Sequence, residues 1–219
     1  MAATVSQAGA GILNLAAAVG GTVAANPTAL NFGTGTSVSK TVQLTLYNVG
    51  QATDTYTLQV VPANGTAPTV ATGSVSLAPG ASQQVAVSLA ASGLAAGEYS
   101  GTVQVTGTAS GTVATVPYWF AAPGSQPAGI SVLYQDYYDN ARSSSSQAVV
   151  FRVVDAAGLP YTGTLRPSLT VAGSGTATRP YTAGDIPGTY AVDIRTGTTS
   201  MQLTFTAGTA TATVIIPVI

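Results

Sequence analysis

The chain has 219 residues, a formal net charge of −1 and only 6% charged residues, whereas an average globular protein has about 25%. Its few Lys and Arg residues stand singly, which argues against nucleic acid and against a polybasic membrane contact as partners. The chain has no histidine and no cysteine, which excludes a Ser-His-Asp triad, a Cys-His dyad, a zinc site with His or thiolate ligands, and a disulfide framework. We therefore expect no catalytic residue, no metal ligand and no cofactor in this chain.

Hydrophobic residues make up 46% of the chain, so threonine, serine, glutamine, glycine and alanine must cover most of its surface. Such a surface suits strands with β-branched hydroxyl residues on their outer face, and it is common in secreted bacterial β-modules. The length suits two sandwiches of about 100 residues each. The composition therefore predicts a two-domain, all-β protein that is extracellular, either secreted or on the cell surface.

The longest helix-like apolar stretch is Ile12–Val19, which follows a glycine turn at Gly9–Gly11. It is too short to cross a bilayer, which takes about 20 apolar residues, and too short to be stable in water by itself. We expect a short N-terminal helix that lies on the first sandwich, pairs with a second copy of the chain or frays. Because Met1–Gly11 has no Lys or Arg for the charged region of a signal peptide, we expect the export signal to lie outside this sequence.

Residues 25–122 alternate apolar and hydroxyl residues between turn residues, which predicts a first β-sandwich of about seven strands. In the clearest strand we expect Leu44 and Leu46 to point into the core. Tyr99 follows a glycine near the start of a late strand. This position predicts a tyrosine corner, in which the hydroxyl bonds back to a nearby backbone group. After a first strand from Ala29, the predicted strands are Thr41–Tyr47, Thr55–Val61, Ser74–Leu77, Gln83–Leu89, Tyr99–Val105 and Thr112–Phe120.

Residues 123–129 are rich in proline and glycine and lack alternation, so they predict a linker. Residues 130–219 predict a second, immunoglobulin-like sandwich, whose first strand alternates with Ile130, Val132 and Tyr134 facing the core. Further predicted strands are Ala148–Val154, Ser168–Val171, Thr176–Tyr181, a strand opened by Gly188-Thr189-Tyr190, and a closing hairpin of Met201–Ala207 and Thr209–Ile219. The predicted fold class is all-β: two tandem immunoglobulin- or fibronectin-like β-sandwiches with a short N-terminal helix.

Several segments of the chain resemble parts of secreted subtilisin-like serine proteases. Gln7–Val19 and Asn26–Gly33 are similar to the end of the catalytic domain in that family, where a glycine-alanine-glycine turn and an alanine-rich helix precede a sandwich that opens with a Pro-x-x-Leu-x-Phe strand. Val116–Phe120 resembles the Val-Pro-Tyr strand that closes fibronectin-like modules of large secreted subtilases. Val153–Pro160, with Gly188-Thr189-Tyr190 downstream, resembles a bacterial immunoglobulin-like repeat.

The resemblance implies a non-catalytic accessory region that follows the catalytic domain of a secreted serine endopeptidase. Residues 1–24 would be the tail of that domain, 25–122 the first sandwich, 123–129 the linker and 130–219 the second sandwich. The catalytic residues of the family match no position, since the chain lacks histidine and the Gly-Thr-Ser-Met-Ala-x-Pro segment around the nucleophile. The implied role is structural or substrate-positioning. The implied partners are the catalytic domain of the parent polypeptide and a protein substrate.

A cell-surface adhesin or a carbohydrate-binding tandem is the alternative function, based on the Thr-rich repeats and a few aromatic residues. Trp119 is the only tryptophan and stands between Tyr118 and Phe120 on a terminal strand. It is a candidate contact for a glycan or peptide. Because alternation turns neighbouring residues to opposite faces and aromatic residues dominate burial, we favour packing in the core or between the domains.

The polar stretch that begins at Asp136 contains further candidate contacts. Tyr134, Tyr137 and Tyr138 flank a loop and can meet a partner, although we favour a core position for Tyr134 and a role in covering the core for the other two. Asp136, Asp139 and Asn140 are the best oxygen cluster for calcium. Because this cluster lacks the length and acidity of an EF-hand loop, a solvated turn is the favoured interpretation.

One charged residue interrupts an otherwise apolar predicted strand. Arg152 can pair across the sheet with Asp193 or with another carboxylate. An exposed pair of this kind contributes only about 0.2–1 kcal/mol. We therefore favour a position on the solvent face of the strand.

Overall fold

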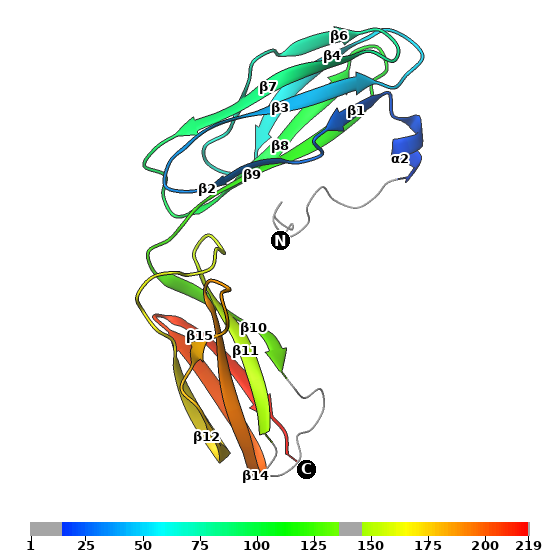
Figure 1. The fold of residues 1–219 in the computed structure, drawn as a ribbon. Coiled ribbons are helices and arrows are strands. Elements are labelled where there is room, and N and C mark those ends of the chain that lie inside the picture. Colours follow the sequence, from blue (N-terminus) through cyan, green and yellow to red (C-terminus); the bar gives the residue numbers. More distant parts are fainter. Residues whose placement is uncertain (1–14, 136–145, 219) are drawn as a thin grey trace. The chain divides into compact units, whose positions relative to one another are not determined.

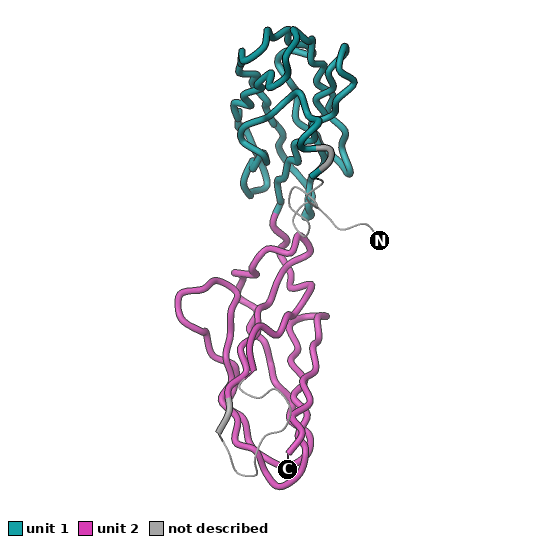
Figure 2. The backbone as a smooth tube through the Cα atoms, turned by 90° about the vertical axis from the view of Figure 1, so that its right-hand side faces the viewer, with its two compact units in different colours: residues 1–122 teal, residues 123–219 magenta. Residues whose placement is uncertain are grey.

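The computed structural model describes residues 15–135 and 146–218, and the regular elements of this part of the chain are strands apart from one short helix (Figure 1). The contacts divide the chain into two compact units, unit 1 (Met1–Ala122) and unit 2 (Pro123–Ile219), which Figure 2 shows in different colours. Each unit has its own sheets and its own hydrophobic core. The prediction of an all-β, sandwich-like protein is confirmed.

The helix α2 (Leu15–Gly20) covers the second half of the predicted Ile12–Val19 helix, and Ile12–Asn14 lies outside the described residues. Its Leu15 and Val19 are 68% and 81% exposed. These two apolar side chains are therefore not buried against the sandwich of unit 1, which was one of the three outcomes that we expected for this helix. Across residues 15–135 and 146–218, no helix has the length and apolar character that a membrane span needs.

Unit 1 is built from two sheets. The four-stranded sheet has the order β1-β3-β7-β5, and the five-stranded sheet has the order β2-β9-β8-β4-β6. The strands are β1 (Val23–Asn26), β2 (Leu30–Thr34), β3 (Val38–Asn48), β4 (Asp54–Pro62), β5 (Thr69–Val70), β6 (Ser74–Leu77), β7 (Ser82–Ala91), β8 (Gly97–Gly107) and β9 (Val113–Ala122).

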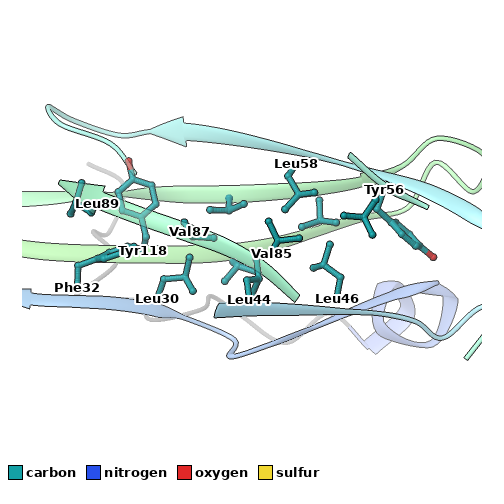
Figure 3. Close-up of a cluster of buried hydrophobic side chains, with 14 of the residues drawn as sticks. Leu30, Phe32, Leu44, Leu46, Tyr56, Leu58, Val85, Val87, Leu89 and Tyr118 are labelled. Carbon is teal, nitrogen blue, oxygen red and sulfur yellow. The ribbon is translucent and has the colours of Figure 1, made fainter. Parts of the chain in front are cut away.

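The core of unit 1 lies between these sheets, as the period-2 pattern predicts. Leu44 and Leu46 on β3 are completely buried, and Leu44 lies opposite Val85 of β7. Figure 3 shows these aliphatic side chains in a row between the strands, with Tyr56 and Tyr118 toward opposite ends. Burial of each such aliphatic side chain stabilises the fold by about 1.5–3 kcal/mol relative to exposure.

The N-terminal strands of unit 1 belong to different sheets. β1 pairs antiparallel with β3, and after a short connection β2 pairs parallel with β9 in the other sheet. In that parallel pair Leu30 lies opposite Tyr118, and both side chains are buried in the core. The second strand of unit 1, β2, and its last strand, β9, are thus direct neighbours.

The predicted tyrosine corner is present. The Tyr99 hydroxyl donates a hydrogen bond of 2.8 Å to the carbonyl oxygen of Ala95, four residues upstream. The Tyr99 ring also lies 6.3 Å from the ring of Phe120 on β9, an ordinary distance for an aromatic pair. The corner therefore fastens the segment before β8 to the core.

A buried aspartate fastens the turn between β8 and β9. The Asp54 carboxylate accepts hydrogen bonds from the Ser110 hydroxyl at 2.6 Å and from the backbone N–H groups of Ala109, Ser110 and Thr55 at 2.9, 3.1 and 2.7 Å. The Ser110 hydroxyl, followed by the Ala109 N–H, lowers the pKa of Asp54 to about 2. The carboxylate is thus held in its charged form by the turn that it caps.

Unit 2 contains β10 (Pro127–Gln135), β11 (Ser146–Asp155), β12 (Ser168–Ala177), β13 (Tyr181–Thr182), β14 (Thr189–Ala207) and β15 (Ala210–Ile216). They are hydrogen-bonded in the order β10-β11-β14-β12, and β13 and β15 also pair with β14. The first part of β14 pairs with β11 and the last part pairs with β15. The long strand β14 therefore joins all the other strands of this six-stranded sheet except β10.

The core of unit 2 confirms the predicted inward residues of two strands. Tyr190, Val192 and Ile194 are buried on the first part of β14, and Leu203 and Phe205 on the last part. The separate strands that we predicted for these segments are joined in β14. Pairing with β12 continues on both sides of a register shift at Gly173/Gly175, so no turn separates the halves.

The first strand of unit 2 differs from its prediction in two ways. β10 begins at Pro127, inside the predicted linker, because proline is tolerated at the first position of a strand and the chain then passes a bulge between Pro127 and Gly129. Tyr134, predicted to face the core, is 50% exposed. A second bulge lies between Val132 and Tyr134, and residues 131–134 are all exposed, so this end of β10 has no buried face.

A second aspartate fastens the turn after β11. The Asp155 carboxylate accepts backbone hydrogen bonds from Gly124, Ala157 and Leu159 at 2.7, 2.8 and 3.0 Å, and Asp155 is 4% exposed. Gly158 closes the turn at a φ of 73°, a conformation that glycine adopts without steric cost. This arrangement confirms the turn predicted at Asp155–Gly158.

Candidate functional site

Trp119, the first predicted contact, lies on β9 between two core residues. Tyr118 and Phe120 are buried in the core of unit 1, whereas Trp119 faces the other side of the sheet and is half-buried. It is therefore not a core residue. Its indole Nε1 atom is buried and has no hydrogen-bond partner among the described residues. The indole must be uncovered before this N–H can donate to a sugar hydroxyl.

The other predicted contacts fall on a segment outside the described residues. Tyr137 and Tyr138 belong to it, as does the calcium candidate formed by Asp136, Asp139 and Asn140. Within residues 15–135 and 146–218, no three acidic side chains gather in a way that could hold a metal ion.

Arg152 does not pair with Asp193. The register of β11 and β14 places Arg152 opposite Thr189 and places Asp193 opposite Ala148. The Arg152 Nε donates a 3.3 Å hydrogen bond to the Thr189 hydroxyl, and Asp193 accepts bonds of 3.1 Å from the Tyr181 hydroxyl instead. The predicted pair with Asp193 is therefore wrong, because it required a register four residues away from the real one.

The structure shows a recess in unit 2 that the sequence analysis missed, which we call the β12 recess. It has a volume of about 450 Å³ and is lined by residues 166–169, 171 and 177–180, the two ends of β12 and the residues that flank them. Ligand sites in proteins have volumes of about 300–1,000 Å³. The floor includes Leu169, Val171 and Ala177, which are half-buried against the core of unit 2.

The two ends of β12 line one recess because β12 and β14 form a ribbon that is interrupted in the middle. The register shift at Gly173/Gly175 leaves residues 197–200 of β14 without regular partners on β12. A Cβ on Gly173 would lie 2.3 Å from the carbonyl oxygen of Ser200, and the Gly173 φ of 89° is also strained for other residues. Glycine is therefore required at this close approach of strands β12 and β14.

Two arginine residues line the β12 recess. Arg166-Pro167 precedes β12 and Arg179-Pro180 follows it, and all four residues line the recess. A proline has a fixed φ and restricts the preceding residue to extended conformations, so each arginine has a constrained backbone. Both arginines are exposed, and no residue of the described lining is acidic. The recess therefore combines an apolar floor with two exposed cationic side chains.

A second, more polar recess of about 320 Å³ lies on the other side of Arg166. Its lining includes Tyr161, Asp185 and Tyr190. The Arg166 Nη1 donates a long hydrogen bond of 3.4 Å to the Tyr190 hydroxyl. Gly188, at a φ of 68°, completes this wall, and a Cβ there would lie 2.8 Å from the carbonyl oxygen of Val153. The buried Tyr190 thus positions an arginine that borders both recesses.

The β12 recess offers hydroxyl and guanidinium groups. Ser168 and Thr178 carry the hydroxyls, and the described lining holds no carboxylate or other base to activate them. The guanidinium groups of Arg166 and Arg179 suit a carboxylate, to which arginine can donate two parallel hydrogen bonds. The sequence signal was the Arg-Pro pair that occurs on either side of Ser168–Ala177.

Comparisons with known proteins do not assign a family. No protein-family model matches the chain, and no curated protein matches it. Among solved structures, the chain is similar to a protein of unknown function from Porphyromonas gingivalis W83, with 13% identity and a TM-score of 0.41 over 90% of this chain and 99% of that chain.

Two further structural likenesses are equally remote. The CsuC-CsuE chaperone-tip adhesion subunit pre-assembly complex from archaic chaperone-usher Csu pili of Acinetobacter baumannii has 10% identity and a TM-score of 0.41 over 91% of this chain and 100% of that chain. A FixG-related protein from Vibrio parahaemolyticus has 20% identity and a TM-score of 0.34 over 39% of this chain and 80% of that chain. At these TM-scores the function has to be argued from the chain's own residues.

Proposed function

We propose that this chain is a non-catalytic accessory region of a secreted subtilisin-like serine endopeptidase, with a structural or substrate-positioning role outside the cell. In this proposal the two units are tandem immunoglobulin- or fibronectin-like sandwiches. Their partners are the catalytic domain of the parent polypeptide and its protein substrate.

The observation that carries the proposal is the pairing of β2 with β9. Leu30 and Phe32 belong to the segment that resembles the opening of a subtilase sandwich, and Val116–Phe120 resembles the strand that closes one. These segments are far apart in the sequence but are adjacent parallel strands, with Leu30 opposite Tyr118. The residues that carry the resemblance therefore belong to one sheet and one core, as expected if both derive from a single module.

The chemistry of the described residues supports a binding or positioning role. The chain has no histidine, and the described lining of the β12 recess offers arginines and apolar side chains without an activated nucleophile. An accessory unit that holds an extended protein chain needs such groups and no acid–base pair.

A cell-surface adhesin or carbohydrate-binding tandem is the second candidate, favoured by the position of Trp119 outside the core. Binding on a glycan array that is lost in Trp119→Ala would support it. The burial of the Trp119 Nε1 atom favours a packing role over glycan binding.

The test is to produce the complete gene product and a version that lacks residues 25–219. Both are assayed on an unfolded protein substrate and on a short chromogenic peptide. A positioning role predicts slower hydrolysis of the protein by the shortened version, with hydrolysis of the short peptide retained. A complete product without hydrolytic activity sensitive to a serine-protease inhibitor would contradict the proposal.

A further inference from the structure

We propose that the β12 recess of unit 2 binds an extended polypeptide segment that carries an acidic side chain, with the carboxylate held by Arg166 or Arg179. This binding does not depend on the protease assignment, since it follows from the residues of unit 2 alone.

The charge of the recess favours an anionic occupant. Arg166 and Arg179 both line it and are both exposed, while its described lining contains no Asp or Glu. A guanidinium has five N–H donors, and the bond from Arg166 to the Tyr190 hydroxyl uses one of them. The Tyr190 contact and the Pro167 ring restrict Arg166 before any ligand arrives. A carboxylate is the group that complements such a pair of guanidinium groups.

The floor of the recess favours a polypeptide over an acidic glycan. Leu169, Val171 and Ala177 present aliphatic surface, and the described lining contains no aromatic ring on which a sugar can stack. An aliphatic side chain buries well against such a floor, whereas sugar hydroxyls there would lose their hydrogen bonds to water. The occupant therefore has apolar side chains next to its acidic one.

The position of β12 favours an extended conformation for that occupant. Among the strands that the structure describes, β12 pairs with β14 alone and ends the sheet. Peptides add to exposed sheet edges as further strands, with backbone hydrogen bonds to the edge and alternate side chains in pockets. A strand that alternates apolar and acidic or hydroxyl residues can place its apolar side chains on the floor.

The test is a titration of ¹⁵N-labelled protein, followed by amide chemical shifts. The probe is a short acetylated and amidated peptide that alternates valine with threonine around a central aspartate. Its asparagine counterpart and an oligogalacturonate are titrated in parallel. We expect the aspartate peptide to shift amides of residues 166–171 and 177–180 and to bind more tightly than the asparagine peptide, with affinity falling as salt is raised.

Single variants separate the recess from general attraction. Arg166→Gln and Arg179→Gln should each weaken binding of the aspartate peptide by up to about fivefold, as expected for an exposed ion pair. Arg195→Gln is the matched control. Arg195 is also exposed and lies opposite Thr176 of β12, the neighbour of Ala177, so it occupies the same pair of strands without lining the recess. It should leave affinity unchanged, and the spectrum of each free variant shows whether it is folded.

Several results would overturn the inference. Equal affinity for the aspartate and asparagine peptides would exclude recognition of the carboxylate. Binding of the oligogalacturonate alone would replace the polypeptide with an acidic glycan. Equal losses in Arg195→Gln and Arg179→Gln would show a diffuse charge effect, and the absence of shifts with any probe at millimolar concentration would exclude a site.

Discussion

Both units contain a Gly-x-Tyr sequence at the start of a strand, and they use the tyrosine differently. In unit 1 the Tyr99 hydroxyl bonds to the backbone of Ala95, so its polar group serves the fold. In unit 2 the buried Tyr190 hydroxyl accepts a bond from Arg166, an exposed residue that borders two recesses. The same local pattern thus fastens one unit internally and positions a surface cation in the other.

The charges follow the same division. Unit 1 has only Lys40, Asp54 and Glu98 as charged residues. The Asp54 carboxylate accepts a hydrogen bond from Ser110 in the β8–β9 turn. All other charged residues of the chain belong to unit 2. In a protein with so few charges, the two arginines around the β12 recess are therefore notable. Most charged residues of the chain, including the two arginines that line the β12 recess, therefore belong to unit 2.

The largest expected effect is the loss of a core aromatic side chain from unit 2. Phe205 is completely buried, with its ring 4.3 Å from that of Phe151. Phe205→Ala should destabilise unit 2 by about 3–5 kcal/mol. Since the two hydrophobic clusters share no residue, calorimetry should show a lowered transition for unit 2 and an unchanged transition for unit 1. Equal shifts of both transitions would show that the units do not unfold separately.

A crowded glycine should be the sensitive point of unit 1. A Cβ on Gly101 would lie 2.5 Å from the Val61 carbonyl oxygen, 2.6 Å from the Tyr118 hydroxyl and 2.8 Å from the Pro62 Cα. Gly101→Ala should therefore destabilise unit 1 by about 1–3 kcal/mol. Gly73→Ala is the control, because no atom lies within 4 Å of the added Cβ. Denaturant unfolding that affects both variants equally would contradict the crowding argument.

The Asp54 turn should make unit 1 sensitive to acid. The pKa of Asp54 is lowered to about 2 in the folded protein, whereas an unfolded aspartate has a pKa of about 3.9. The unfolded state therefore binds more protons between these values. The stabilisation is complete above about pH 4 and is lost as the pH falls through about 2. Urea unfolding measured across this range should show the slope, and Asp54→Asn should remove its largest single contribution.

The smallest expected effect separates the two tyrosines. Tyr99→Phe removes a 2.8 Å hydrogen bond and should cost unit 1 about 0.5–1.5 kcal/mol. Tyr190→Phe removes a 3.4 Å bond to an exposed arginine and should cost unit 2 less. If Tyr190→Phe proves the more destabilising change in urea unfolding, the assignment of its hydroxyl to the recess rather than the fold is wrong.

Strand positions could be predicted where alternation and turn residues agree. Leu44, Leu46 and Val192 were expected in the core and are buried there. Tyr134 was expected in the core and is exposed, because β10 has a bulge between Val132 and Tyr134 and has exposed residues on both faces over residues 131–134, neither of which alternation predicts. The predicted linker, residues 123–129, extends past the start of β10, because Pro127 is the first residue of that strand.

The candidate site depended on pairings that single strands do not encode. The Arg152–Asp193 prediction failed because register between β11 and β14 is set by the whole sheet. The β12 recess was missed because it forms only when residues on both sides of β12 are brought together. The Arg-Pro dipeptide occurs twice in the sequence, but the two occurrences are separated by a full strand.

The coding sequence upstream of the Met1 codon gives the most direct test that this chain is an accessory region of a subtilisin-like protease. The proposal predicts that the open reading frame continues upstream and encodes the Asp and His motifs and a Gly-Thr-Ser-Met-Ala-x-Pro segment in the same polypeptide. A stop codon directly upstream, or a continuing frame without these motifs, would contradict it.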